Sequence, residues 1–139
     1  RIEFVRSVGG VSFYDDSKAT NPDSTIVALE AFREPLILIL GGRNKGMDFA
    51  PLAQFIKQRS TVKWVVVMGE SKQSIKESLL AQGFENITEA QDLEEAVTLA
   101  YGIADAGDVI LLSPACASFD MFRNFEERGD RFKEIVERL

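Results

Sequence analysis

Apolar residues along the chain fall into short blocks, and the spacing within each block predicts its secondary structure. Residues 2–17 alternate around Gly9-Gly10, which predicts two short strands joined at the glycine pair. Three later apolar runs are continuous, as is typical of parallel strands covered on both faces, and a fourth, shorter run is a strand candidate. These four segments are 35–40, 62–69, 108–113 and 87–90.

Between these strands, apolar residues recur at helical spacing and predict five helical segments. The segments are 21–32, 51–59, 71–82, 92–104 and 119–139. Asn21 or Asp23 is expected to cap the first, Asp48 to precede the second and Gly83 to end the third, while Gly129 could interrupt the last. The alternation predicts an α/β fold: an open, mostly parallel Rossmann-like sheet with helices on both faces, preceded by an N-terminal β-hairpin.

Composition limits the classes of function. At 139 residues the chain is predicted to be one domain, 1–139, and its net charge of −6 argues against nucleic acid or an anionic membrane as a partner. The absence of histidine removes Ser-His and Cys-His nucleophilic pairs and argues against a zinc site. Cys116 has no second cysteine with which to pair, which fits a reducing compartment. No apolar run approaches the roughly 20 residues that span a bilayer.

Three turns after predicted strands carry the candidate chemistry. They are residues 15–21 ("DDSKATN"), 41–46 ("GGRNKG") and 113–118 ("SPACAS"), and they supply hydroxyls, lysines and free backbone N–H groups. In parallel sheets, ligands bind beyond the carboxyl ends of the strands. The turns therefore predict a site for a ligand that carries carboxylates or phosphates.

These features also have structural interpretations. The glycine pair at 41–42 could form only a tight turn, and the order of residues after it is not that of a Walker P-loop. Cys116 is expected to be a small buried residue, because no histidine is present to activate it. Phe119, Phe122 and Phe125 lie at helical spacing and are expected to pack in the core.

Three stretches of the chain resemble a known family closely. "DDSKATNPDSTIVAL", "GGRNKGMDF" and "LLSPACASFDMFRNFEERGDRF" resemble the C-terminal domain of the Mur ligases, in the same order and across the whole chain. The last stretch is specific for the members that add D-glutamate to UDP-N-acetylmuramoyl-L-alanine. The Asp-Asn-Pro-Arg tetrapeptide of the diaminopimelate- or lysine-adding members is absent.

The resemblance implies a cytoplasmic, three-domain enzyme of peptidoglycan synthesis, of which this chain is the C-terminal domain. ATP and Mg²⁺ convert the substrate carboxylate into an acyl phosphate, which the D-glutamate amine attacks. The loop that holds the ATP phosphates and the metal ligands are expected in the central ATPase domain, and the UDP substrate is expected to bind the N-terminal domain. This chain alone is therefore expected to be inactive and to supply the amino-acid pocket and one wall of the ATP cleft.

The resemblance also assigns roles residue by residue. Lys18 matches a family lysine that lines the cleft and is the predicted catalytic residue, Asp16 matches the residue that binds the ATP ribose, and Arg1 matches an arginine near the nucleotide. Phe119 stands where some relatives carry a smaller aliphatic residue, and the backbone around it is expected to serve. Ser118 has a structural alternative, as the cap of the final helix. The predicted D-glutamate-binding residues are Thr20, Lys45, Ser118, Phe119 and Phe125.

Three other functions fit parts of the sequence. A stand-alone domain could bind acidic amino acids or nucleotides without catalysis. Another ligase of the same superfamily could add L-alanine or extend folate with glutamate. A flavodoxin-like domain would share the sheet, but "GGVSFYDDSK" lacks the Ser/Thr-rich turn expected after its first strand.

Overall fold

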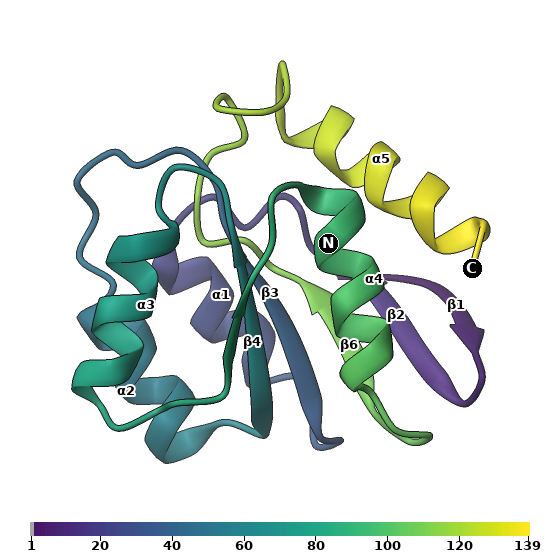
Figure 1. The fold of residues 1–139 in the computed structure, drawn as a ribbon, viewed down its shortest axis with the longest axis horizontal. Helices are drawn as coiled ribbons and strands as arrows, with labels where there is room; N and C mark the ends of the chain where they lie inside the picture. The colour runs from purple at the N-terminus through teal and green to yellow at the C-terminus, as the bar shows by residue number, and fades with distance from the viewer. Residues whose placement is uncertain (1) are drawn as a thin grey trace.

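The computed structural model describes residues 2–139, so the predicted nucleotide-binding residue Arg1 lies outside the described residues. Six strands form one sheet in the order β1-β2-β6-β3-β4-β5 (Figure 1). All neighbouring pairs are parallel except β1 with β2, which confirms the predicted sheet. The strands are β1 (Glu3–Val8), β2 (Val11–Asp15), β3 (Leu36–Gly41), β4 (Val62–Met68), β5 (Ile87–Glu89) and β6 (Val109–Leu112).

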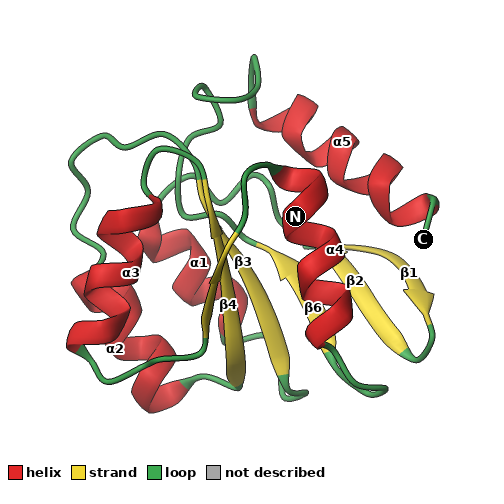
Figure 2. Ribbon diagram, viewed as in Figure 1, coloured by secondary structure: helices red, strands yellow, loops and turns green. Residues whose placement is uncertain are grey.

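Helices cover both faces of this sheet, as the sequence predicts (Figure 2). They are α1 (Pro22–Leu29), α2 (Ala50–Arg59), α3 (Lys72–Ala81), α4 (Leu93–Ile103) and α5 (Phe125–Glu137). The central strand β3 is buried on both sides: Leu36, Leu38 and Leu40 contribute to the core under α1, α2 and α3, whereas Ile37 and Ile39 contribute to the core under α4 and α5. A strand enclosed on both faces has no polar side, which explains its continuous apolar run.

The N-terminal hairpin is part of the main sheet. Gly9 and Gly10 have φ of 57° and 81°, the positive values that a tight two-residue hairpin turn requires. The second strand, β2, then pairs on its other edge with β6 in parallel, from Ser12 opposite Val109 to Asp15 opposite Leu112. The loop after β2 therefore begins beside the loop after β6.

The helix ends follow the predicted caps in part. The Oδ1 atom of Asn21 accepts the backbone N–H of Ser24 at the start of α1, and Gly83 follows α3 with φ of 78°. The helix α2 begins one residue earlier than predicted, and Asp48 Oδ1 accepts the backbone N–H of Ala50.

The prediction for the last helix is wrong at its start. The helix α5 begins at Phe125, because the side chain of Asn124 caps it by accepting the backbone N–H of Glu127. Residues 119–124 form turns and bends instead. Gly129 does not interrupt α5; it allows close packing, since a Cβ atom there would lie 2.8 Å from Asp15 Oδ2.

Of the three phenylalanines predicted for the core, only Phe122 packs against one of the two cores. Phe119 lies outside the helix and is 54% exposed. Phe122 packs, partly buried, against the core under α4 and α5, and Phe125 is half-buried at the first position of α5.

The chain is expected to fold alone and to unfold in one cooperative transition, because both cores share one sheet. The single tryptophan, Trp64, donates from Nε1 to Thr88 Oγ1 at 2.8 Å and reports on the β4–β5 edge. Its fluorescence and the far-UV circular dichroism should give coincident urea unfolding curves. Separate midpoints for the two signals would contradict a single unit.

Candidate functional site

The loops that follow the parallel strands gather at one edge of the sheet, which is the upper edge in Figure 1. The chain leaves β3 toward α2 on one face, but it leaves the neighbouring β6 toward α5 on the other face. Connections that diverge between adjacent strands mark the place where ligands bind in open α/β sheets. We call the four loops at this edge the loop rim; they are residues 16–20, 42–48, 69–71 and 113–122.

The glycine pair after β3 allows two neighbouring loops to pack closely. Gly41 N donates to Pro114 O at 2.9 Å, and Arg43 N donates to Ala117 O at 2.8 Å. A Cβ atom on Gly42 would lie 2.4 Å from Ala117 O, a distance that no side chain tolerates. Gly41 is the last residue of β3 and Gly42 does not form a turn, so the tight-turn interpretation is replaced by one of close approach between the loops.

The short loop after β4 ties the other two together. Gly42 N donates to Ser71 Oγ at 3.2 Å, and Ser71 N donates back to Gly42 O at 3.0 Å. The neighbouring Glu70 N donates to Asp120 Oδ2 at 3.1 Å, and Asn44 N donates to Glu70 Oε1 at 3.2 Å. The loops after β3, β4 and β6 are therefore held in register by hydrogen bonds.

Cys116 lies inside this arrangement and is fully buried. Burial raises the pKa of its thiol to about 11, against a smaller opposing effect of the contact with Ser71. The thiol is therefore protonated at neutral pH and a poor nucleophile. The prediction of a small buried residue is confirmed.

Arg128 connects the loop after β2 to the loop after β6, and the sequence analysis did not identify it. Its guanidinium donates to Ser17 Oγ at 2.9 Å, to Ser17 O at 2.7 Å and to Cys116 O at 2.9 Å. The side chain is 0% exposed, and this burial lowers its pKa to about 10, so it stays charged at neutral pH. One signal was available: Arg128 stands one turn before Phe132, on the apolar face of α5.

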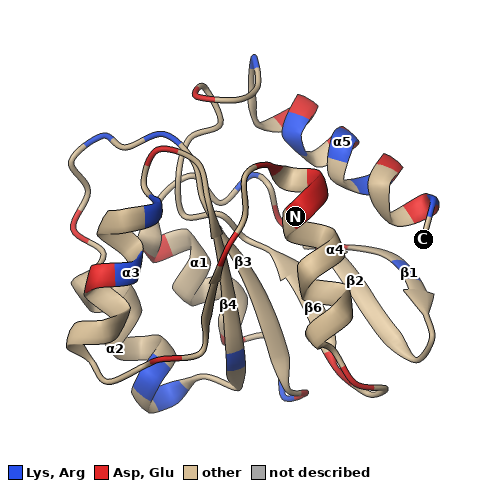
Figure 3. Ribbon diagram, in the orientation of Figure 1, with Lys and Arg blue, Asp and Glu red and all other residues tan. Residues whose placement is uncertain are grey.

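Lys45 projects from the loop after β3, where Figure 3 shows basic residues. Its side chain is exposed, and its ammonium lies 5.6 Å from the centroid of the Phe119 ring. Among residues 2–139, no carboxylate forms an ion pair with it. Two of the five predicted D-glutamate-binding residues are therefore in contact, and the lysine charge is available to an anion.

Ser118 is 1% exposed, and its Oγ atom has no hydrogen-bond partner in the part of the chain that the structure describes. Its carbonyl accepts the backbone N–H groups of Met121 and Phe122 at 3.0 and 2.8 Å, which forms the turn before α5. The alternative role as the cap of the final helix is wrong, because Asn124 caps α5. A buried hydroxyl without a partner is unfavourable, so a ligand that bonds it would be stabilised.

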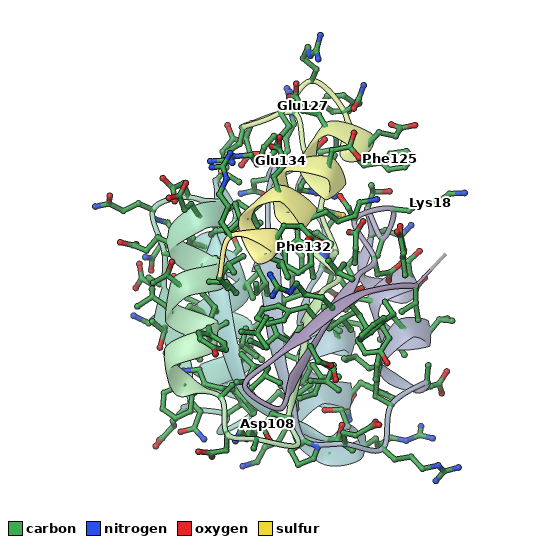
Figure 4. All side chains as sticks on the ribbon, turned by 90° about the vertical axis from the view of Figure 1, so that its right-hand side faces the viewer. Lys18, Asp108, Phe125, Glu127, Phe132 and Glu134 are labelled. Atoms are coloured by element: carbon green, nitrogen blue, oxygen red, sulfur yellow. The ribbon has the colours of Figure 1, made fainter. Side chains whose placement is uncertain are left out.

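The remaining predicted residues lie toward β2. Asp16 is 1% exposed and accepts from Ser113 Oγ at 2.8 Å, so it links the ends of β2 and β6. Lys18 is exposed and extends from the loop after β2 toward solvent, with Phe125 nearby on α5 (Figure 4). Thr20 is half-buried at the end of that loop.

A cleft of about 350 Å³ between the loop after β2 and α5 brings Lys18 and Phe125 together. Asp15, Glu126 and Asp130 line the same cleft. Burial raises the pKa of Asp15, against the lowering effects of the Ser17 backbone N–H and of the Lys133 charge. Three carboxyl groups make this cleft less suitable for an anion than the Lys45 side of the rim.

The described residues contain neither a cluster of metal ligands nor a membrane-spanning helix. No group of three or more His, Cys, Asp or Glu side chains within 2–139 is placed to hold a metal ion. No helix in the same range is long and apolar enough to cross a membrane.

Comparison with known proteins decides the family. Residues 1–116 match the family model described as "Mur ligase, glutamate ligase domain". The chain belongs to the Mur ligase family. Its sequence is 55% identical over 136 residues to UDP-N-acetylmuramoylalanine--D-glutamate ligase of Pelotomaculum thermopropionicum, an alignment that covers 98% of this chain. The chain spans about 30% of the length of that relative.

Solved structures of a murein peptide ligase and of FolC share the fold. A murein peptide ligase from Psychrobacter arcticus superposes with a TM-score of 0.67 at 16% identity, over 99% of this chain and 30% of that one. FolC from E. coli, solved in complex with ADP, superposes with a TM-score of 0.63 at 17% identity, over 96% of this chain and 31% of that one. At these identities the likeness concerns the fold alone, and it confirms the predicted architecture of this Mur ligase C-terminal domain.

Proposed function

We propose that this domain belongs to an ATP-dependent ligase that joins D-glutamate to UDP-N-acetylmuramoyl-L-alanine, and that it binds the D-glutamate. The name of the relative that is 55% identical over 98% of the chain supports this substrate. The observation that carries the proposal is that two polar groups of the loop rim lack ion-pair or hydrogen-bond partners among residues 2–139. Lys45 presents an ammonium without a described carboxylate partner, and Ser118 presents a hydroxyl without a hydrogen-bond partner among residues 2–139.

The chemistry of D-glutamate fits this arrangement. The amino acid carries two carboxylates, and a lysine and a hydroxyl are suitable donors to them. Because Ser118 Oγ is covered, the loop at 113–122 must shift slightly for a carboxylate to reach it. Binding of both carboxylates would direct the amine toward the acyl phosphate, and such positioning can contribute roughly 7–11 kcal/mol to the acceleration of a reaction between two bound molecules.

The nucleotide and metal roles are divided between this chain and the rest of the protein. ATP supplies the phosphoryl group that activates the substrate carboxylate, and we propose that Asp16, Lys18 and Arg1 contribute to the wall of its cleft. The described residues offer no cluster of metal ligands, so Mg²⁺ is proposed to bind outside them.

The proposal is tested by the amino-acid selectivity of the complete protein. The protein is supplied with UDP-N-acetylmuramoyl-L-alanine, ATP and Mg²⁺, and the release of ADP and the mass of the product are measured with D-glutamate, L-glutamate or L-alanine. We expect a product with D-glutamate alone, and no ATP hydrolysis by residues 1–139 alone. Ligation of L-alanine, or no ligation by the complete protein, would favour the other ligases or the binding module.

Replacing Ser118 by alanine tests the hydroxyl. If Ser118 binds a carboxylate of D-glutamate, Ser118→Ala should raise the KM for D-glutamate about fivefold, the equivalent of a hydrogen bond of about 1 kcal/mol. Folding stability should fall by less than about 0.5 kcal/mol, because the hydroxyl makes no described bond. A loss of stability with an unchanged KM would exclude the ligand role.

A further inference from the structure

The backbone near Lys45 is held by hydrogen bonds, but its side chain forms no ion pair with a described residue. Arg43 N is bonded to Ala117 O at 2.8 Å and Asn44 N to Glu70 Oε1 at 3.2 Å, so neighbouring loops hold the two residues before Lys45. Within the loop, Gly46 N is bonded to Asn44 Oδ1 at 3.1 Å. The side chain itself is exposed, and the structure gives its ammonium no ion pair with a described residue. A flexible four-carbon stem leaves such an ammonium free to occupy many positions unless something holds it.

The Phe119 ring is the neighbour that could restrict this ammonium. It is 54% exposed and belongs to neither hydrophobic core, although Phe122, three residues later, packs against one of them. Burial therefore does not account for its position. The ring centroid lies 5.6 Å from Lys45 Nζ, within the roughly 6 Å over which a ring face attracts a cation.

Hydrogen bonds hold the chain on both sides of Phe119. The preceding residue, Ser118, closes a turn by accepting two backbone N–H groups, and the following residue, Asp120, accepts Glu70 N at 3.1 Å. The backbone that carries the ring is therefore held in place, and Phe119 directly follows Ser118, whose hydroxyl has no hydrogen-bond partner among residues 2–139.

We propose that the Phe119 ring is a positioning residue: it holds the Lys45 ammonium by a cation–π contact, so that Lys45 and Ser118 together receive the carboxylates of the amino-acid substrate. This proposal rests on the proposed function. It assigns the side chain of Phe119 a role through Lys45, in place of a direct contact with the substrate. A leucine at position 119 retains apolar bulk but has no ring face, whereas a tryptophan has the face that binds cations best.

The test measures KM and kcat for D-glutamate in the complete protein carrying Phe119→Leu or Phe119→Trp. Phe119→Leu should raise the KM about two- to fivefold, the size expected for one partly exposed cation–π contact. The kcat and the KM for the UDP substrate should change little. Phe119→Trp should keep the KM for D-glutamate at the wild-type value or lower it. In a protein that already carries Lys45→Gln, Phe119→Leu should have no further effect.

A second measurement does not depend on activity. In the complete protein labelled with ¹³C-lysine, the Hε signals of Lys45, assigned by their loss in Lys45→Gln, should show an upfield ring-current shift. The shift should disappear in Phe119→Leu and persist in Phe119→Trp.

Several results would overturn the proposal. It is wrong if the ring-current shift is absent, if Phe119→Leu leaves the KM unchanged, or if the same rise in KM appears in the Lys45→Gln background, which would indicate direct contact between the ring and the substrate. If the complete protein does not ligate D-glutamate, the proposed function fails. The ring-current shift then still reports separately whether Phe119 holds Lys45.

Discussion

Replacing Lys45 by alanine should raise the KM for D-glutamate at least tenfold in the complete protein. The ammonium stands at the edge of the sheet where β3 and β6 diverge, and it has no described ion-pair partner that would compete with a ligand. A hydrogen bond from a charged donor contributes roughly 1.5–3 kcal/mol, which corresponds to a factor of about 10 or more in binding. The KM for the UDP substrate should change little.

Lys57 provides a matched control for this change. It lies on α2, away from the loop rim, and donates to Gly83 O at 3.2 Å. Lys57→Ala should leave the KM for D-glutamate within about twofold of the wild-type value. An unchanged KM in Lys45→Ala would remove Lys45 from the pocket.

Replacing Arg128 by methionine should lower the free energy of unfolding by at least about 2 kcal/mol. The change removes the donor to Ser17 O and Cys116 O and leaves these two carbonyls in a buried region. Each buried carbonyl without a donor costs about 1–3 kcal/mol, and relief of the buried guanidinium charge offsets part of this loss. Urea unfolding of residues 1–139, followed by the fluorescence of Trp64, measures the effect.

Arg131 on the same helix separates this role from a general effect of losing an arginine. Its guanidinium is partly exposed and pairs with Glu94 and Glu134 on the surface. Arg131→Met should therefore cost at most about 1 kcal/mol. Equal losses in the two variants would contradict the assignment of Arg128 as the tether between loops.

The fold could be predicted because its strongest signals are local. The apolar run at 35–40 and the cap at Asn21 each specify an element without reference to distant residues. The start of α5 could not be predicted from local signals, because Phe119, Phe122 and Phe125 have helical spacing although residues 119–124 are not helical. Asn124 supplies the actual cap, and Ser118 closes the preceding turn.

The site could be predicted only in its location and in the residues that the family resemblance supplied. The three polar turns after β2, β3 and β6 do meet at one edge of the sheet. The contacts that hold them depend on tertiary packing: Arg128 bonds to Ser17, which is 111 positions away in the chain, and Glu70 bonds to Asp120. No local sequence pattern predicts such pairs, except that Arg128 lies on the apolar face of its helix.

The structure of the complete protein with D-glutamate bound tests the proposed binding site most directly. We expect a carboxylate of D-glutamate within about 3.2 Å of Lys45 Nζ and a second bond from Ser118 Oγ to the same ligand. D-glutamate bound instead in the cleft lined by Asp15, Lys18 and Asp130, with Lys45 and Ser118 not engaged, would contradict it.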